Sequence, residues 1–375
     1  MKLFRKNQPS DSTVMLQTAR DRENYELPAA CEKALYESLR RSVPIIDAAL
    51  SKIVRLTGGY RVICSEEKYQ DMLDAFVDEV PVGLSGASLQ SFTDGYLDSL
   101  LTYGNAAGEI LADTTAGRII GLYNADVSCL EVESGSTPFS RRYFVRDGDK
   151  KREIPNPALI MFTALKPMPG QVYGASLLRG LPSVSMILMK IYECIGQNFD
   201  RLGNIRYAVT YRPSSDSGAN GRERAKQIAE EWSKGMTHSA NGEIRDFVAV
   251  GDVDIKVIGA DSQTLDTNIP VRQLLEQILS KLSLPPFMLG LSWSSTERMS
   301  SQQADILTSE LEYYRRLLTP VITRTALAFL RLRGIDAGVR VEWDKINLQD
   351  EVSLAEARLK NAQAAKIERE LGLTD

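Results

Sequence analysis

The residues that could do chemistry in this chain are few, and the first is its single histidine, His238. A nucleophile relay needs a histidine held between a nucleophile and an orienting carboxylate. His238 lies in the polar run KGMTHSANG (234–242), which contains no carboxylate. We therefore interpret His238 as a surface-loop residue and not as a catalytic base.

A pair of aspartates, Asp252 and Asp254, has the spacing of a magnesium site. Alternate residues of a strand project from one face, and hard cations prefer carboxylate oxygens. However, Lys256 lies beside the pair, and the chain has no phosphate-cradling loop. A solvated strand face is the favoured interpretation, and a metal-dependent nucleic-acid enzyme using this pair is the alternative. Glu109 and Asp113 likewise have the spacing of an exposed alternating face.

Other catalytic signatures are absent from the sequence. It contains no GxxxxGK[ST], GxGxxG, GxSxG or HExxH pattern, so the common nucleotide-binding and hydrolase classes are excluded. The four cysteines have no CxxC spacing, which argues against a zinc site and predicts buried, reduced thiols; they are Cys31, Cys64, Cys129 and Cys194. The sequence predicts no catalytic residue, no metal and no cofactor.

Two runs combine basic and aromatic residues, as single-strand binders often do. In RRYFVRDGDKKRE (141–153) the acidic residues dilute the charge, so a β-hairpin turning at Asp147 and Gly148 is favoured. In YYRRLL (313–318) the charges of Arg315 and Arg316 have two possible partners, a phosphate or a neighbouring acidic helix. The second is the more common arrangement.

The composition is that of an ordinary globular chain. Its 375 residues predict two or more folding units, and a formal net charge of −4 gives no basic footprint for tight duplex binding. No secretory signal follows the first residues, and no run of about 18 apolar residues occurs. We expect a protein that is made in the cytoplasm and makes no membrane contact.

Apolar spacing predicts the elements of the first half. It indicates a helix over 31–56 with Pro44 at a first-turn position, a strand over 60–65, and a helix around Tyr96 that ends at Gly104. Between 105 and 166 short β-branched runs predict an antiparallel sheet.

In the second half the same patterns alternate with a small module. We expect helices over 184–203 and 268–283, a small α/β module between them, a long helix from Ser300 kinked at Pro320, and a strand over 339–344. The fold class is therefore α+β.

The order of these parts resembles that of the phage portal proteins, the head-to-tail connectors of tailed phages, in particular the HK97-like group. Each stretch is degenerate alone, but the four occur in the family's order. They are RSVPIIDAALSKIVRLTGGYRV (41–62), QVYGASLLRGLPSVSMILMKIYECIGQNFDRLGNIRYAVTY (171–211), IPVRQLLEQILSKLSLPPFMLGL (269–291) and SSQQADILTSELEYYRRLLTPVITRTALAFL (300–330).

The resemblance implies a division into the family's parts. These are an N-terminal arm (1–30), a wing (31–178), a first stem helix (179–204), a clip (205–262), a second stem helix (263–283), a tunnel loop (284–299), a long wing helix (300–333) and a C-terminal strand with a helical tail (334–375).

The resemblance also implies where DNA would pass. The tunnel loop would present Ser292, Trp293, Ser294, Ser295, Thr296 and Arg298 to the channel, and the stem helices would add Lys190, Gln197, Arg201, Arg272, Gln277 and Lys281. A loop of hydroxyl groups with one arginine offers DNA weak, nonspecific hydrogen bonds, and a mildly acidic subunit does not hold phosphates strongly. The alternative is a surface turn whose Trp293 packs on its own subunit.

The implied function is structural. The resemblance predicts a ring, usually of twelve subunits, at one capsid vertex, through which double-stranded DNA is packaged and ejected. Its partners would be further copies of itself, the terminase large subunit, the head-tail adaptor, and the major capsid and scaffold proteins. Its location would be the virion, after assembly in the host cytoplasm. The alternatives are the metal-dependent enzyme above and a scaffold protein that forms no ring.

Overall fold

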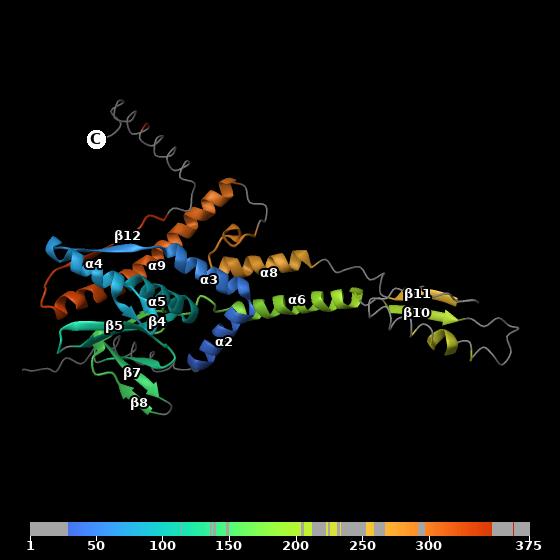
Figure 1. The fold of residues 1–375 in the computed structure, drawn as a ribbon, viewed down its shortest axis with the longest axis horizontal. Coiled ribbons are helices and arrows are strands. Elements are labelled where there is room, and N and C mark those ends of the chain that lie inside the picture. The colour runs from blue at the N-terminus through green and yellow to red at the C-terminus, as the bar shows by residue number, and fades with distance from the viewer. Residues whose placement is uncertain are drawn as a thin grey trace, which may run out of the picture. The chain divides into compact units, whose positions relative to one another are not determined.

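The computed structural model describes residues 29–113, 115–135, 137, 140–147, 150–203, 206–211, 223, 226–230, 233, 253–258, 267–291, 297–346 and 363. The chain divides into two compact units. Unit 1 comprises residues 1–186 and 273–375, and unit 2 comprises residues 187–272. Figure 1 shows the elements of both units.

The helix predicted over 31–56 is in fact two helices, α2 (Ala29–Ser42) and α3 (Pro44–Thr57). The break is at Val43, whose φ of −123° and ψ of 88° are not helical. A residue that precedes proline is pushed out of the helical region, and proline is favoured at the first position of a new helix. The prediction of one helix over 31–56 was therefore wrong, but the predicted first-turn position of Pro44 is confirmed. The apolar face of α3 is buried as expected: Ile46, Ala49, Leu50 and Ile53.

Strands from the two ends of unit 1 pair with each other. β1 (Tyr60–Cys64) runs antiparallel to β12 (Val339–Trp343), which confirms both predicted strands. Along the chain, β1 is followed by the short helix η1 (Glu67–Tyr69) and by α4 (Gln70–Glu79). The ring of Phe76 in α4 stacks on the ring of Phe329 in α9 (Glu297–Leu332) at a centroid distance of 4.0 Å. This contact anchors α4 to α9.

A five-stranded sheet forms the centre of unit 1, in the order β3-β2-β5-β4-β9. Its strands are β2 (Pro81–Val82), β3 (Gly86–Ala87), β4 (Asn105–Asp113), β5 (Arg118–Ala125) and β9 (Ile160–Ala164).

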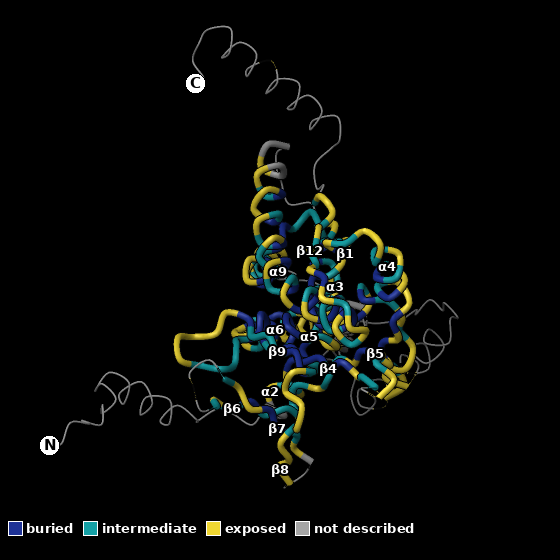
Figure 2. The backbone as a smooth tube through the Cα atoms, turned by 90° about the vertical axis from the view of Figure 1, so that its left-hand side faces the viewer, coloured by how far each residue is buried: buried dark blue, intermediate teal, exposed yellow. Residues whose placement is uncertain are grey.

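Helix α5 (Leu89–Tyr103) packs on this sheet and confirms the helix predicted to end at Gly104. The Ser88 hydroxyl caps its start by accepting a hydrogen bond from the Ser91 amide at 3.2 Å, and Gly104 ends it with a φ of 76°. A Cβ on Gly108 of β4 would lie 2.6 Å from the Phe92 ring, which shows how closely α5 approaches the sheet. Figure 2 shows the buried residues gathered around α5 and β4.

A second sheet contains the predicted basic hairpin. β6 (Leu130–Ser134), β7 (Arg141–Asp147) and β8 (Lys150–Glu153) follow one another in an antiparallel order. Asp147 pairs with Lys150, so the predicted hairpin is confirmed. Its inner face packs on the central sheet through a cluster of Val132, Tyr143 and Ile160. β9 is preceded by the short helix η2 (Pro157–Leu159).

The longest element is α9 (Glu297–Leu332), which continues through Pro320. At 1.5 Å per residue its 36 residues span roughly 54 Å. The helix begins three residues before the predicted Ser300, because a glutamate is favourable in a first turn and so extends the helix. Its buried stripe follows the predicted spacing and includes Leu307, Leu311, Tyr314, Leu318, Ile322 and Phe329.

The remaining elements confirm the predicted helices, and one strand pair of the predicted module lies between them. α6 (Leu181–Gly203) runs from unit 1 into unit 2, and α8 (Asn268–Lys281) runs from unit 2 back into unit 1. In unit 2, β10 (Arg206–Tyr211) pairs antiparallel with β11 (Val253–Ile258). The fold is thus α+β, as predicted. In the described part of the chain no helix is both long and apolar enough to cross a membrane.

The cysteines are only partly as expected. Cys64 is buried in β1, but Cys129 and Cys194 are exposed. Cys129 lies in the turn before β6, where its amide donates to the Asp126 carbonyl at 3.1 Å. The prediction that the thiols are buried was therefore wrong at these two positions, because a scattered cysteine gives no periodicity from which its burial can be inferred.

Candidate channel and assembly surfaces

The predicted tunnel loop is positioned by the end of α8 and by η3 (Pro286–Leu289). Leu282 and Leu284 are buried, and the Leu284 amide donates to the Leu279 carbonyl at 3.1 Å. Between these two leucines, Ser283 has a φ of 53°, and Gly290 closes η3 with a φ of 75°. Left-handed backbone at a non-glycine residue costs about 1–2 kcal/mol, so buried packing on both sides holds the chain in this sharp turn.

The loop residues themselves are outside the description. Ser292, Trp293, Ser294, Ser295 and Thr296 all lie in the range 292–296, which the structure does not describe. The backbone of Arg298 belongs to the first turn of α9. The assignment of these six residues to a channel stays a prediction.

The predicted channel residues of α6 share one side of the helix. Lys190 and Gln197 are seven residues apart and both are exposed. Arg201 follows Gln197 by four residues, and residues spaced by four and seven lie on the same helical face. The Gln197 amide donates to the Glu193 carboxylate at 3.3 Å. Lys190 and Gln197 therefore share an exposed polar face of α6, whereas the side chain of Arg201 lies outside the description.

The rest of the α6 surface is apolar and largely uncovered. Tyr192 and Phe199, seven residues apart, are 44% and 67% exposed. A helix that is apolar all round is normally buried, and the first half of α6 exposes large apolar side chains on several sides: Met186, Ile187 and Met189. Sequence analysis missed this exposed surface, although the unbroken apolar run of α6 was its signal.

The predicted channel residues of α8 do not share one face. Gln277 and Lys281 are neighbours on the exposed side, four residues apart. Arg272 is also exposed, but it lies five positions before Gln277. The two side chains are therefore roughly 140° apart around the helix axis. The exposed side between them is polar and forms a shallow pocket lined by Gln273, Glu276, Gln277 and Ser280.

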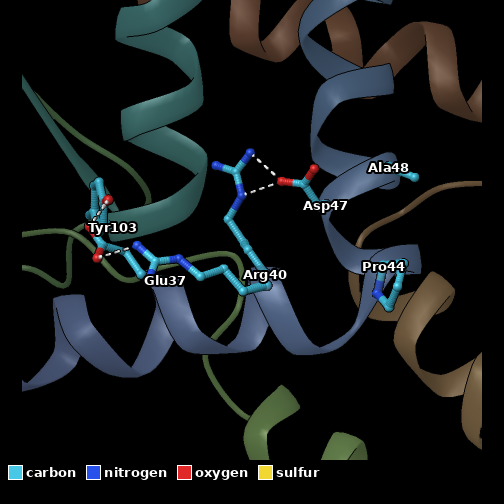
Figure 3. A pocket seen from close by; sticks show the side chains of 7 residues that line it. Glu37, Arg40, Pro44, Asp47, Ala48 and Tyr103 are labelled. Carbon is cyan, nitrogen blue, oxygen red and sulfur yellow. Dashed lines mark hydrogen bonds and ion pairs between the residues drawn. The ribbon is translucent and has the colours of Figure 1, made fainter.

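A second shallow pocket lies where α2, α3 and α5 meet (Figure 3). Arg40 extends from α2 and donates to Asp47 of α3 at 2.7 Å. It also donates to Asp98 and Thr102 of α5, each at 2.7 Å. Burial lowers the pKa of Arg40, but the hydrogen bonds to Asp98 and Asp47 outweigh it and raise the pKa. This arginine joins three helices and is a structural centre.

The same pocket contains a tyrosine–carboxylate pair. The Tyr103 hydroxyl donates to Glu37 at 3.1 Å. Burial and the neighbouring Glu37 raise the pKa of Tyr103 to about 12, so the phenol stays neutral at physiological pH. Lys33, one turn before Glu37, pairs with Asp126 in the turn after β5. Together these contacts attach α2 to the central sheet.

The outer face of the β6–β8 sheet is a network of ion pairs. Arg142 pairs with Glu153 at 2.7 Å, and Lys151 pairs with Glu131 at 2.8 Å. The hydrogen bond from Lys151 lowers the pKa of Glu131. Phe144 lies between them, and the Lys151 ammonium is 4.2 Å from its ring centroid. Of the two aromatic residues of this basic run, Phe144 is thus covered by its strand neighbours, and Tyr143 lies in the inner cluster.

Arg315 has partners that neither sequence interpretation considered. It is 3% exposed, and its Nε donates to the Thr57 carbonyl at the end of α3 at 2.8 Å. Its guanidinium lies 5.1 Å from the Trp343 ring centroid, and Glu312 of its own helix pairs with it at 3.1 Å. The expected phosphate or acidic neighbouring helix was therefore wrong for Arg315.

The alternative metal site gains no support from the geometry. Asp254 lies in β11 opposite Thr210, whereas Asp252 and His238 are outside the described residues. Among the residues that the structure describes, no group of three or more His, Cys, Asp or Glu could hold a metal ion.

Comparison with known proteins decides the family. A family model described as phage portal protein matches residues 87–367, which is most of the chain. The chain belongs to the phage portal protein family. The family predicted from the four sequence stretches is thereby confirmed. No curated protein sequence matches the chain.

Chains from gene transfer agent particles share the fold of this portal-family chain. A chain from the neck of a native gene transfer agent particle, computed with C12 symmetry, matches with a TM-score of 0.60 and 17% identity, covering 88% of this chain and 89% of that chain. A chain from the virion of the native particle matches with a TM-score of 0.59 and 17% identity, covering 90% and 89%. An HK97 family phage portal protein from Corynebacterium diphtheriae has 12% identity and a TM-score of 0.42, covering 80% and 92%.

Proposed function

We propose that this chain is the subunit of a portal ring, of about twelve copies, at one vertex of a phage capsid. Double-stranded DNA would be packaged and ejected through the ring. The observation that carries the proposal is the family match over residues 87–367. The shared fold with a chain from a particle neck computed with C12 symmetry supports the twelvefold ring.

The surface of α6 supports ring closure. A ring is built from heterologous contacts repeated by rotation, and such contacts bury apolar surface that the isolated subunit exposes. Tyr192 and Phe199 offer such a surface on one side of α6. We assign these residues to the contact with the neighbouring subunit, whose copy of α6 or α8 would cover them.

The polar face of α6 suits a DNA channel. Lys190 and Gln197 are exposed on the side opposite Phe199 and Leu188, so burial of the apolar side between subunits leaves them accessible. They sit in a chain whose net charge is −4, so the ring would hold phosphates weakly. Weak binding is what sliding DNA requires.

The remaining parts of the proposal follow the family. The module around β10 and β11 would be the clip, which meets the terminase during packaging and the head-tail adaptor afterwards. The capsid and scaffold proteins would surround the wing, and the ring would reside in the virion after assembly in the host cytoplasm. We propose no enzymatic activity, because the energy for packaging would come from the motor.

The test is the mass of the purified protein in solution, followed by negative-stain class averages. The proposal expects annular particles of about twelve 41.6 kDa subunits with a central hole wide enough for duplex DNA. A protein that stays monomeric or dimeric at high concentration contradicts it and makes a magnesium-dependent nuclease assay on Asp252→Asn and Asp254→Asn variants the next step. Nuclease protection of DNA in capsids built with and without the protein then tests the conduit.

A further inference from the structure

The free edge of β8 carries positive charge that has no partner within the subunit. Lys150 and Arg152 are exposed, and the side chain of neither makes an ion pair or a hydrogen bond within the described parts of the chain. There, β8 pairs only with β7, so its other edge presents unpaired backbone N–H and C=O groups. Such an edge is a ready surface for another chain.

Other cations of the hairpin, unlike Lys150 and Arg152, have carboxylate partners within the described parts of the subunit. Arg142 and Lys151 are neutralised by Glu153 and Glu131 on the outer face of the sheet. Successive residues of a strand point to opposite faces, so Lys150 and Arg152 point away from that network. Their charge is therefore available to a partner.

Helix α4 carries the opposite charge, without an ion pair to its aspartates among the described residues. Asp71, Asp74 and Asp78 follow one another at spacings of three and four residues, which places them on one side of the helix. Leu73 and Phe76 on the other side are buried. No lysine or arginine among the described residues forms an ion pair with these aspartates.

This acidic side is unfavourable in the isolated subunit. Like charges three or four residues apart repel each other by a few tenths of a kcal/mol per pair. Asp78 and Glu79 also lie at the C-terminal end of α4, where the helix dipole is negative and where no basic residue compensates. A cation from outside the subunit would relieve both effects.

The two surfaces lie far enough apart to contact different neighbours. Figures 1 and 2 show β8 at the lower end of unit 1 and α4 well above it. A head-to-tail ring joins two different surfaces of the same chain. Along a strand, Lys150 and Arg152 are roughly 6.7 Å apart, and along a helix Asp74 and Asp78 are roughly 6 Å apart. The two pairs of charges therefore match in spacing as well as in sign.

We infer that the free edge of β8 is a docking surface for α4 of the neighbouring subunit, with Lys150 and Arg152 facing Asp74 and Asp78. The inference rests on the proposed ring, because it needs a second copy of this chain. Gln70 already donates to Asp74 at 2.8 Å, which fixes the carboxylate and leaves its other oxygen for the partner.

The experiment reverses the charges on each side and then on both. The variants are Lys150→Glu with Arg152→Glu, Asp74→Lys with Asp78→Lys, and the four changes combined. Sedimentation velocity measures the assembled fraction over a series of NaCl concentrations. We expect each double variant to reduce the ratio of rings to free subunits at least about tenfold at low salt, because like charges are then brought together. The combined variant restores assembly.

The control changes the same charge elsewhere. Lys345→Glu with Arg179→Glu alters two exposed cations that have no ion pair among the described residues, and it should assemble like the wild type. If both double variants form rings as readily as the wild type does, this contact is overturned and the proposed function stands. A wild-type protein that forms no rings under any condition overturns both. Restoration by the combined variant also excludes misfolding as the cause of the loss.

Discussion

The guanidinium of Arg315 lies over the ring of Trp343, with 5.1 Å from Cζ to the ring centroid, while its Nε donates to the carbonyl that ends α3. One side chain thereby joins α9, α3 and β12. Trp343 is held in turn by a hydrogen bond from its Nε1 to the Thr319 hydroxyl at 3.0 Å. This cluster fixes the long helix to the β1–β12 sheet.

Replacing Arg315 by methionine should destabilise the subunit. The variant keeps an apolar stem but removes a hydrogen bond from a charged donor and the contact with Trp343, so we expect a loss of about 3 kcal/mol in the free energy of unfolding. Urea denaturation followed by circular dichroism measures it. Arg316→Met is the control, because Arg316 is exposed on the same helix, and its effect should stay within about 0.5 kcal/mol. Equal effects of the two variants would contradict the structural role.

Gly104 is a glycine at which an added methyl group should be poorly tolerated, because both its backbone conformation and its surroundings oppose it. Its φ is 76°, and a Cβ there would lie 2.4 Å from backbone atoms of Ala175 and Ser176. Gly104→Ala should therefore cost about 3 kcal/mol or more, from strain and overpacking together. Gly334→Ala is the matched comparison, since Gly334 has a φ of 73° but no atom within 4 Å of its Cβ position. Gly334→Ala should lower the free energy of unfolding by about 1 kcal/mol. Thermal unfolding of both variants measures the difference, and an equal loss in the two would contradict the prediction.

The pair of Lys33 and Asp126 should give a dependence of stability on acid pH. Burial raises the pKa of Asp126, but hydrogen bonds from Lys33 and Ser128 outweigh it and lower the pKa from 3.8. A carboxylate with a lowered pKa stabilises the fold above its unfolded pKa, and this contribution disappears as the pH falls through the folded pKa. The raised pKa of Lys33 matters only above pH 10.5.

Asp126→Asn should therefore be less stable than the wild type at pH 7 by about 0.5 kcal/mol, since the pair is partly exposed. As the pH falls through the lowered pKa of Asp126 the two proteins should become equally stable. Urea titrations at several pH values measure this convergence. A difference that persists unchanged at pH 2.5 would assign the effect to packing and not to charge.

Apolar periodicity predicted the elements whose burial decides their structure. The stripe of α5 was readable because Phe92, Tyr96 and Leu100 are all fully buried. The sequence also placed Pro44 in a first turn, but the break before it at Val43 was missed because the apolar spacing continues through this residue. A pattern of side-chain burial does not report a local backbone restriction.

The candidate surfaces were harder to predict, for a different reason. Arg315 finds its partners in α3 and β12, and no local pattern links it to Thr57 or Trp343. The spacing of Lys190 and Gln197 did place them on one face, because both lie on a single helix. Their assignment to a channel came from the family resemblance, which carries information on assembly that one subunit does not contain.

Phe199 provides the most direct test of ring closure through α6. It is 67% exposed, so Phe199→Asp should leave the folded subunit intact by circular dichroism. If a neighbouring subunit covers this ring, a carboxylate there would be buried without a partner, which costs several kcal/mol per contact, and the protein should sediment as free subunits. Glu193→Lys on the polar face of the same helix is the control and should still form rings. Rings of unchanged stability in Phe199→Asp would move the subunit contact away from this side of α6.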